Sequence, residues 1–311
     1  MLLIAIDRRI VSPLQQRTMR FLLTSTLVAA TSLALNAQYG SFDASAVRSA
    51  KAAGLVVVLD AGDSPYNQTI MNAVKSEWKF NTASMDFVTV AELGTQPISP
   101  EKCYLLKTAK VDPVKFEGTF LTLVQGWKMK KGESLQAKNN AFTSIPSEQE
   151  LAFLLIDPKA INEGSMAPML MLYIKHMQDY LKLVETGKIT DKATADRTYA
   201  GRTRLVRDTR LDLAKDHLDK SLPDEGAVKA QYTAPMRIVT LADVANTVKN
   251  QDRATTVSDV VMTGDYKTKH CFKRLFNAGT GELMYLADDA ALYGKKEGFI
   301  EVDLKNIERA R

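Results

Sequence analysis

A strand–loop–helix–strand pattern over residues 55–90 constrains the fold of this chain more than any other stretch. Residues 55–59 (LVVVL) form a continuous apolar run rich in β-branched side chains, and residues 60–65 (DAGDSP) interrupt it. Residues 66–78 then carry apolar side chains at helical spacing, and residues 87–90 (FVTV) return to a strand pattern. A strand that is apolar at every position is typical of a central strand buried on both faces, so this stretch predicts an α/β sheet.

The rest of the chain predicts further strands and a helical middle. Strand patterns occupy residues 103–108, 116–124, 151–156, 236–240, 257–263, 271–276 and 282–286. Helical spacing of apolar residues extends over residues 168–185 and again over residues 194–222. We therefore expect an α/β or α+β fold, in which a mixed sheet is covered by helices and a helical insertion lies in the middle of the chain.

This pattern divides the chain into four segments. Residues 1–37 comprise a signal peptide and the residues before it, residues 38–165 an N-terminal α/β unit, residues 166–222 the helical insertion, and residues 223–311 a C-terminal α/β unit. We expect the strands of the two α/β units to share one sheet, because the first unit alone would bury too little surface. The strand–helix–strand patterns at the two ends are loosely alike, but not enough to predict a repeat.

The N-terminus has the pattern of a secretory signal peptide. Arg20 precedes the apolar residues 21–34, and Ala37 provides a small side chain before a cleavage site ahead of Gln38. The apolar segment is shorter than the roughly 20 residues that a membrane-spanning helix needs. We expect a periplasmic or secreted protein without a transmembrane helix in the mature chain, and an N-terminal membrane anchor is the alternative. Met19 competes with Met1 as the true start.

The charge of the chain gives no argument for a nucleic-acid partner. The formal net charge is +5, but residues 1–37 contribute four arginines and one aspartate, which leaves 37 basic and 35 acidic residues, or +2, in the mature chain. So small a charge does not favour binding to nucleic acid, and we expect none.

The two cysteines, Cys103 and Cys271, both lie in apolar, strand-like surroundings. Without C-x-x-C spacing they do not suggest a metal or redox site, and they are predicted to be buried core thiols. A disulfide between them is the alternative, since export makes one chemically accessible.

The loop after the first strand is the best candidate for a binding site. Asp60, Asp63, Ser64 and Asn67 lie where the carboxyl end of a strand meets a helix N-terminus, and open α/β sheets bind ligands at such places. Two carboxylates there are suited to a divalent cation. The competing interpretation is structural, with Asp63 or Ser64 capping the helix and Asp60 ending the strand. The loop lacks both G-x-G-x-x-G and the P-loop lysine, so it names no cofactor.

The sequence contains no recognisable catalytic motif. Ser165 lies between a strand and a helix, but its surroundings are not G-x-S-x-G, and a helix cap explains it better. His176, His217 and His270 are the three histidines, and none lies in a known metal-binding or catalytic motif. We therefore assign no catalytic residue and favour a protein that is not an enzyme.

Arg204 and Arg207 belong to an arginine-rich stretch that could hold a polyanion or dock a protein partner. Asp208 follows Arg204 at helical i,i+4 spacing. This pairing favours a solvated face held by salt bridges over a docking site.

Two regions of the chain resemble an uncharacterised group of bacterial envelope proteins that carry signal peptides. The first contains Tyr66-Asn67, Ala73-Val74 and Trp78, and the second contains residues 271–276 (CFKRLF) with Leu283-Met284-Tyr285. The resemblance covers the two end units and implies export and a bacterial source, but no activity.

Export and the missing catalytic motifs together predict a non-enzymatic protein that binds a ligand or an envelope protein partner. The alternative function is an exported metal-dependent hydrolase that uses Asp60 and Asp63.

Overall fold

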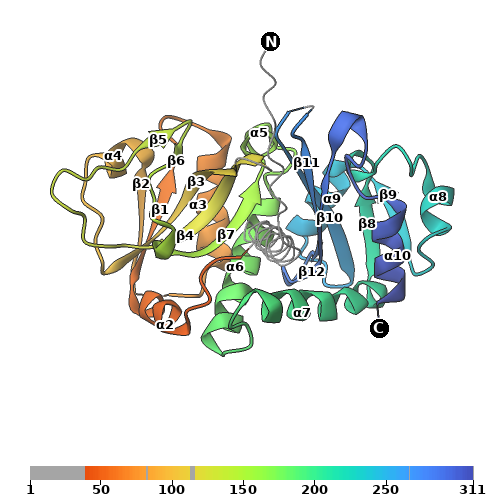
Figure 1. Cartoon of the computed structure of the whole chain (residues 1–311), viewed down its shortest axis with the longest axis horizontal. Coiled ribbons are helices and arrows are strands. Elements are labelled where there is room, and N and C mark those ends of the chain that lie inside the picture. The colour runs from red at the N-terminus through yellow and green to blue at the C-terminus, as the bar shows by residue number, and fades with distance from the viewer. Residues whose placement is uncertain (1–38, 82, 113–115, 266, 311) are drawn as a thin grey trace, which may run out of the picture. The chain divides into compact units, whose positions relative to one another are not determined.

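Two separate mixed sheets, each covered by helices, make up the chain in the computed structural model, which describes residues 39–81, 83–112, 116–265 and 267–310 (Figure 1). This arrangement confirms the predicted α/β class with mixed sheets covered by helices. The predicted signal peptide, residues 1–37, lies outside the described residues.

The N-terminal half of the described chain runs from α2 to α6. Its elements are α2 (Ala44–Ala52), β1 (Gly54–Leu59), α3 (Pro65–Glu77), β2 (Met85–Thr89), α4 (Val90–Gly94), β3 (Lys102–Asp112), β4 (Phe116–Gln125), β5 (Ala137–Lys138), β6 (Ala141–Phe142), η2 (Ser147–Gln149), β7 (Glu150–Ile156), α5 (Pro158–Asn162) and α6 (Met169–Glu185). The strand order is β2-β1-β3-β4-β7. β1 is parallel to both of its neighbours, whereas β4 and β7 extend the sheet in antiparallel fashion. The apolar strand β1 is therefore central, as its pattern predicts.

The C-terminal half of the described chain runs from α7 to α10. Its elements are α7 (Lys192–Arg202), η3 (Thr203–Asp208), β8 (Arg210–Ala214), η4 (Lys215–His217), α8 (Glu225–Lys229), β9 (Met236–Val239), α9 (Leu241–Lys249), β10 (Thr255–Thr263), β11 (His270–Asn277), β12 (Leu283–Ala290), η5 (Leu292–Gly294) and α10 (Glu301–Arg309). Its sheet has the order β12-β11-β10-β8-β9. β8 is parallel to β9 and β10, and β11 and β12 are antiparallel additions.

The two halves have the same topology. In each, the first strand in the chain lies between two parallel strands, and two antiparallel strands extend one side of the sheet. Even the irregularities match, because a β-bulge leaves one residue unpaired near the start of the fifth strand, Leu151 in β7 and Met284 in β12. A capping box also opens the helix after each second strand, at Thr89 and at Thr240. The loose likeness seen in the sequence is thus a repeat of five strands, to which β5 and β6 are additions in the first sheet.

The prediction that strands from both ends of the chain share one sheet is wrong, because each half completes a sheet of its own. β1 takes both of its neighbours from the N-terminal half, and the hairpin partners β4 and β7 then add to β3. Local connections of this kind are favoured, since sequential strands are usually neighbours.

The predicted helix over residues 194–222 is also wrong in its second part. α7 ends at Arg202, and β8 then supplies the central strand of the second sheet. Leu211 and Leu213 are buried and alternate with polar residues, which is a strand period of two and not a helical period. The predicted helical insertion of residues 166–222 therefore contains the first strand of the C-terminal half, while its first helix is confirmed as α6.

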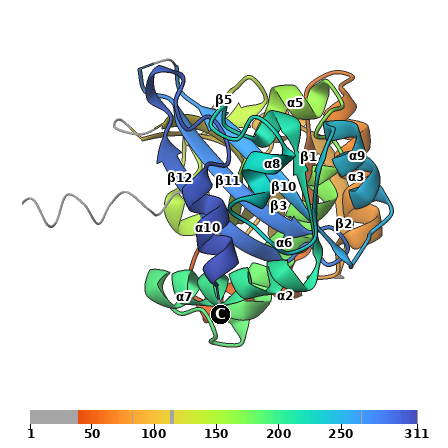
Figure 2. The same ribbon diagram turned by 90° about the vertical axis from the view of Figure 1, so that its right-hand side faces the viewer.

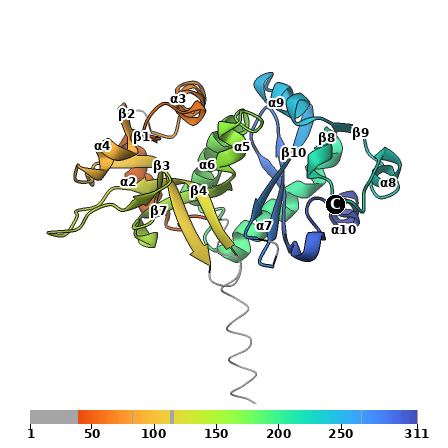
Figure 3. The same cartoon turned by 90° about the horizontal axis from the view of Figure 1, so that it is seen from above.

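Helix α6 lies between the two sheets and contributes to the packing of both (Figures 1 and 3). Tyr173 of α6 belongs to one buried cluster with Leu55 and Val57 of the first sheet and with Val257 and Phe276 of the second. The second sheet packs its other face against α10, whose Leu304 and Ile307 are buried (Figure 2). The two halves are therefore joined through a common apolar core.

Cys103 and Cys271 are buried free thiols in different sheets, which confirms their prediction as core residues. Burial raises the pKa of both thiols to about 12. Among the residues that the structure describes, no helix combines the length and apolar character needed to cross a membrane.

Candidate functional site

The loop after β1 folds around a buried ion pair. The carboxylate of Asp60 pairs with the ammonium group of Lys107 on β3, and the two residues are only 2% and 4% exposed. Ser64 donates a hydrogen bond to Oδ2 of Asp60 at 3.2 Å. Asn67 accepts from the Asp60 N–H at 2.7 Å and donates to the carbonyl oxygen of Gly62 at 2.9 Å. The structure thus brings Asp60, Ser64 and Asn67 together, and they fix the turn from β1 into α3.

The ammonium group of Lys107 occupies the position beside Asp60 where the sequence suggested a divalent cation. The ring of Tyr66 lies over Lys107, with 4.2 Å between Nζ and the ring centroid. Burial lowers the pKa of Lys107, although the charge of Asp60 and its hydrogen bond act in the opposite direction. Burial, reinforced by the charge of Asp60, raises the pKa of Tyr66. The Asp60–Lys107 pair is therefore enclosed by protein and is not open to a ligand at the carboxyl end of β1.

Asp63 does not join this cluster, because its side chain is exposed. Within residues 39–81, 83–112, 116–265 and 267–310, no group of three or more His, Cys, Asp or Glu side chains is placed to hold a metal ion. The geometry of the loop therefore gives no support to a two-carboxylate metal site.

A groove of about 1050 Å³ lies between the two halves, at the carboxyl ends of β3, β7 and β10. Its walls are the end of β3 and the start of β4, the β5–β6 hairpin, the junction of β7 with α5, and residues 262–265 and Thr268 after β10. The β3–β4 and β10–β11 connections are equivalent in the two repeated topologies. Ligands of open α/β sheets bind outside the carboxyl ends of strands, so the groove occupies a favoured position for binding.

The groove is lined by hydroxyl and carboxylate groups together with small apolar side chains. Thr119, Thr143, Thr263 and Thr268 line it, and so do Glu117, Asp157, Asp265 and Lys138. The hydroxyl of Thr263 is buried and makes no hydrogen bond within the described part of the chain.

The β5–β6 hairpin links this groove to the loop after β1. Asn139 and Asn140 form its two-residue turn with positive φ angles of 53° and 61°, which Asn tolerates better than most residues. The side-chain oxygen of Asn140 accepts a hydrogen bond from the N–H of Ala61 at 3.0 Å. The loop that follows Asp60 is therefore bonded, through Ala61, to the hairpin whose Lys138, Asn139 and Ala141 line the groove.

Arg204 and Arg207 are exposed and lie on the short helix η3. Arg207 donates to the carbonyl oxygen of Glu308 at 3.0 Å and lies 3.4 Å from its carboxylate. Arg207 therefore fastens the end of α10.

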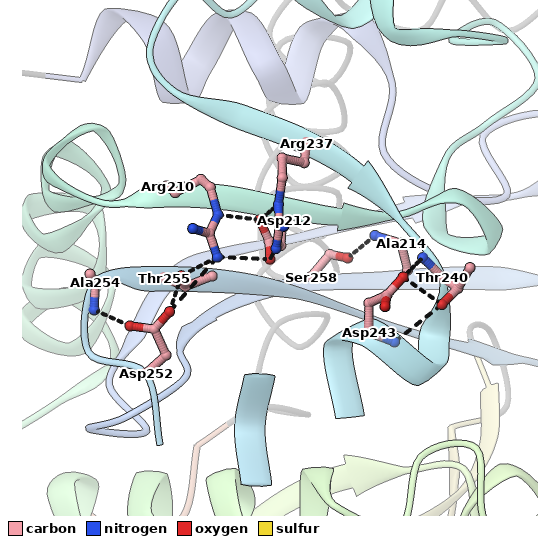
Figure 4. A network of polar contacts seen from close by, with 10 residues as sticks. All are labelled: Arg210, Asp212, Ala214, Arg237, Thr240, Asp243, Asp252, Ala254, Thr255 and Ser258. Atoms are coloured by element: carbon pink, nitrogen blue, oxygen red, sulfur yellow. Dashed lines mark hydrogen bonds and ion pairs between the residues drawn. The ribbon is translucent and has the colours of Figure 1, made fainter. Parts of the chain in front are cut away.

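A neighbouring arginine, Arg210, has a structural role in the second sheet (Figure 4). Arg210 and Arg237 both donate from Nε to Oδ1 of the fully buried Asp212, at 2.9 and 3.0 Å. Arg210 also donates to the hydroxyl of Thr255 at 2.8 Å. The network joins β8, β9 and β10, so the guanidinium groups are already used within the protein.

The sequence analysis missed the groove because its walls come from residues far apart in the chain. A turn signal, Gly264-Asp265 after an apolar strand, marks the second wall, but nothing in the sequence indicates that it faces the first.

Comparison with protein-family models, with curated proteins and with solved structures found no match to this chain.

Proposed function

We propose that this chain is an exported, non-enzymatic binding protein whose ligand occupies the groove between the two halves. The groove itself carries the proposal, because its volume of about 1050 Å³ and its position at strand ends suit a ligand. Pockets for small ligands span roughly 300–1,000 Å³, so this groove of about 1050 Å³ lies just above that range. Export rests on the signal-peptide pattern of residues 1–37.

The contacts around Asp60 favour binding over hydrolysis. Its carboxylate is neutralised by Lys107, and Asp63 is exposed outside the cluster. We therefore propose no role for these two residues in catalysis, and assign Asp60 a structural role in the turn from β1 into α3.

Ligand-induced stabilisation of the full chain tests the binding site. Thr143 is exposed on the groove wall, so Thr143→Trp fills the groove, and Thr95→Trp, at the exposed end of α4, is the matched control. A panel of sugars, amino acids, short peptides and nucleotides is screened by thermal unfolding. A ligand at one hundred times its Kd stabilises a protein by about 2.7 kcal/mol. We expect a compound that stabilises the native chain and Thr95→Trp but not Thr143→Trp. A ligand that stabilises all three equally binds elsewhere and contradicts the proposal.

The N-terminal sequence of protein recovered from a bacterial producer tests export. We expect the full-length gene to yield an envelope or secreted protein that begins at or near Gln38. Uncleaved protein held in the membrane would favour the N-terminal anchor, and uncleaved protein in the cytoplasm would contradict export.

A further inference from the structure

We propose that the folded protein protects the peptide bond between Ala37 and Gln38, so that the N-terminal segment is removed before the rest of the chain folds. This inference rests on the proposed function, since it takes residues 1–37 as the signal peptide that is cut off. The bond itself lies outside the described residues. The inference is carried by the residues that follow it, 39–43, which form an N-terminal strap on the protein.

Tyr39, two residues after the expected cut, is buried in the protein. Only 7% of it is exposed, and it belongs to the apolar cluster around α6. Its ring is nearly parallel to those of Tyr180 and Tyr199, whose centroids lie 6.4 and 5.9 Å away. Its hydroxyl donates a hydrogen bond to Oδ1 of Asp196 at 2.8 Å. The first side chain of the strap is therefore held by both packing and a hydrogen bond.

The next two residues lie against the backbone of the first sheet. A Cβ atom on Gly40 would lie 2.1 Å from the carbonyl oxygen of Leu151 in β7, so this close approach requires glycine. The N–H of Ser41 donates to the same carbonyl oxygen at 3.0 Å. The hydroxyl of Tyr180 donates to the carbonyl oxygen of Ser41, also at 3.0 Å. The strap is therefore fixed through its backbone as well as through the ring of Tyr39.

The strap passes directly into helix α2. Phe42 packs against the same apolar cluster as Tyr39. Oδ1 of Asp43 accepts from the N–H groups of Ser45 and Ala46 at 2.7 and 3.2 Å, which caps the helix. The described chain is therefore attached to the fold from its first residue onwards, without a slack segment before α2.

This attachment limits the access of a peptidase to the bond. An enzyme that cuts after Ala37 has to accommodate residues on both sides of the bond in its active-site cleft, and chain ends resist proteolysis where the fold ties them down. Because Tyr39 is buried, only Gln38 separates the bond from the body of the protein. The enzyme therefore reaches the bond only while the strap is detached.

The partners of the strap lie far along the chain. Asp196, which accepts from Tyr39, is 157 residues further on, and Tyr180, which donates to Ser41, is 139 residues further on. Tyr180 belongs to α6 and Asp196 to α7, so the strap contacts both halves of the molecule. During export the strap has no place to dock until these helices have formed. Cleavage is therefore possible early and is blocked once the fold is complete.

Cleavage of the full-length chain, folded in mild detergent, by a bacterial signal peptidase tests this order. The reference substrate is a synthetic peptide of residues 28–45, which contains the bond but not the partners of the strap. Mass spectrometry of the products measures the rate of cutting between Ala37 and Gln38. We expect the folded chain to be cut at least about tenfold more slowly than the peptide, since cutting requires the rare detached state.

Two substitutions show whether the strap causes the protection. Tyr39→Ala removes the buried ring and should bring the rate for the folded chain to within about threefold of the peptide rate. Leu93→Ala removes a buried side chain from a different apolar cluster and is the control for a general loss of stability. If Tyr39→Ala fails to fold, Tyr39→Phe keeps the ring, loses the bond to Asp196 and should raise the rate by about threefold to tenfold. Peptides that carry the same changes at Tyr39 correct for altered recognition by the enzyme.

Pancreatic elastase, which cuts after small side chains, provides a measurement that does not depend on a signal peptide. It should release a chain that begins at Gln38 from the peptide and from Tyr39→Ala, but not from the folded native chain.

Two results would overturn the inference. One is an equal rate for the folded chain and the peptide with either enzyme, and the other is an equal increase in rate in Leu93→Ala and Tyr39→Ala. Failure of the proposed export gives a different result, because the signal peptidase then spares the peptide as well as the folded chain. Removal of the segment as a signal peptide is then refuted, while elastase still decides whether the fold protects the bond.

Discussion

The middle strands of the N-terminal half are apolar at positions where those of the C-terminal half carry buried charges. Val56 lies opposite Tyr104 on the next strand, and Asp212 occupies the equivalent place opposite Val257. The same registers make Leu121 of β4 equivalent to the fully buried Lys273 of β11. One topology therefore tolerates either chemistry in its core, provided that strand registers, the bulge and the caps agree.

The C-terminal half keeps its buried charges by pairing them. Asp259 accepts from Arg274 and from the hydroxyl of Tyr173, and Arg274 also donates to the carbonyl oxygen of Leu155 in the other half. A paired buried charge is tolerated, whereas removal of one partner is costly. In the N-terminal half, Asp60 directly after β1 pairs with Lys107 of β3, and Glu150 of β7 pairs with Lys110.

The largest expected effect is the loss of a charge partner in the C-terminal half. Arg274→Met leaves Asp259 buried without its cation and should lower the free energy of unfolding by about 3–5 kcal/mol. Arg274→Met/Asp259→Leu should recover a large part of this loss, since the unpaired charge is then absent. Denaturant unfolding measures both variants.

A matched substitution in the N-terminal half sharpens this comparison. Lys107→Met should cost about 3 kcal/mol or less, because Asp60 keeps the hydrogen bond from Ser64 and lies at a strand end. Equal or larger destabilisation by Lys107→Met than by Arg274→Met would show that the halves depend on their buried charges to the same extent.

His176 of α6 tests how tightly the halves are joined, since it packs against Phe276 of the second sheet. Burial lowers its pKa from 6.5 to about 4; the charge of Asp179 opposes this shift, and the charges of Arg274 and Arg202 add to it. The unfolded chain therefore binds a proton between pH 6.5 and 4 that the folded chain does not, and stability falls as the pH falls through this range. The expected loss at pH 4 is about 3 kcal/mol.

His176→Gln should reduce the slope of unfolding free energy against pH between pH 6.5 and 4. His217→Gln is the comparison within the C-terminal half, since burial also lowers the pKa of His217. An unchanged slope in His176→Gln would mean that the interface around α6 opens to solvent and lets the histidine titrate normally.

The two equivalent helix caps, at Thr89 and Thr240, test whether the two halves also gain the same stability from equivalent residues. Thr89→Ala and Thr240→Ala each remove a side-chain acceptor for the third amide of a helix and should each cost about 1 kcal/mol. Their effects should add in the double variant, since the two caps share no partner. Denaturant unfolding measures the free energy of unfolding of the three variants. A marked difference between the two single variants would show that the halves share their topology but not the energies of equivalent residues.

The smallest expected effect concerns the groove. Glu117→Gln/Asp265→Asn should change the free energy of unfolding by only about 0.5 kcal/mol, because Glu117 is exposed and the Asp265→Asn amide retains an acceptor for the turn. A larger loss in thermal unfolding would show that the groove carboxylates serve folding, in the way that Asp212 and Asp259 do.

The elements with strong local signals were predictable from the sequence. Continuous apolar character identified β1, Ser64-Pro65 marked the start of α3, and α6 at Met169–Glu185 matches the predicted helix over residues 168–185. In each case the signal lies within the element itself and does not depend on the rest of the fold.

The pairing of elements was not predictable in the same way. β8 is short and carries Asp212, whose burial is explained only by its pairing with Arg210 and with Arg237 of β9. The loop at Asp60 was found, but Lys107, which neutralises it, lies on β3 without any motif that connects the two. The groove depends on contacts between the two halves, and a single sequence does not specify them.

The position of α6 has a consequence for how the protein is made. The ribosome releases α6 together with the N-terminal half, but Val257 and Phe276, which complete its packing, are synthesised much later. Until then part of the apolar surface of the helix has no partner, so the N-terminal half cannot reach its final packed state during translation.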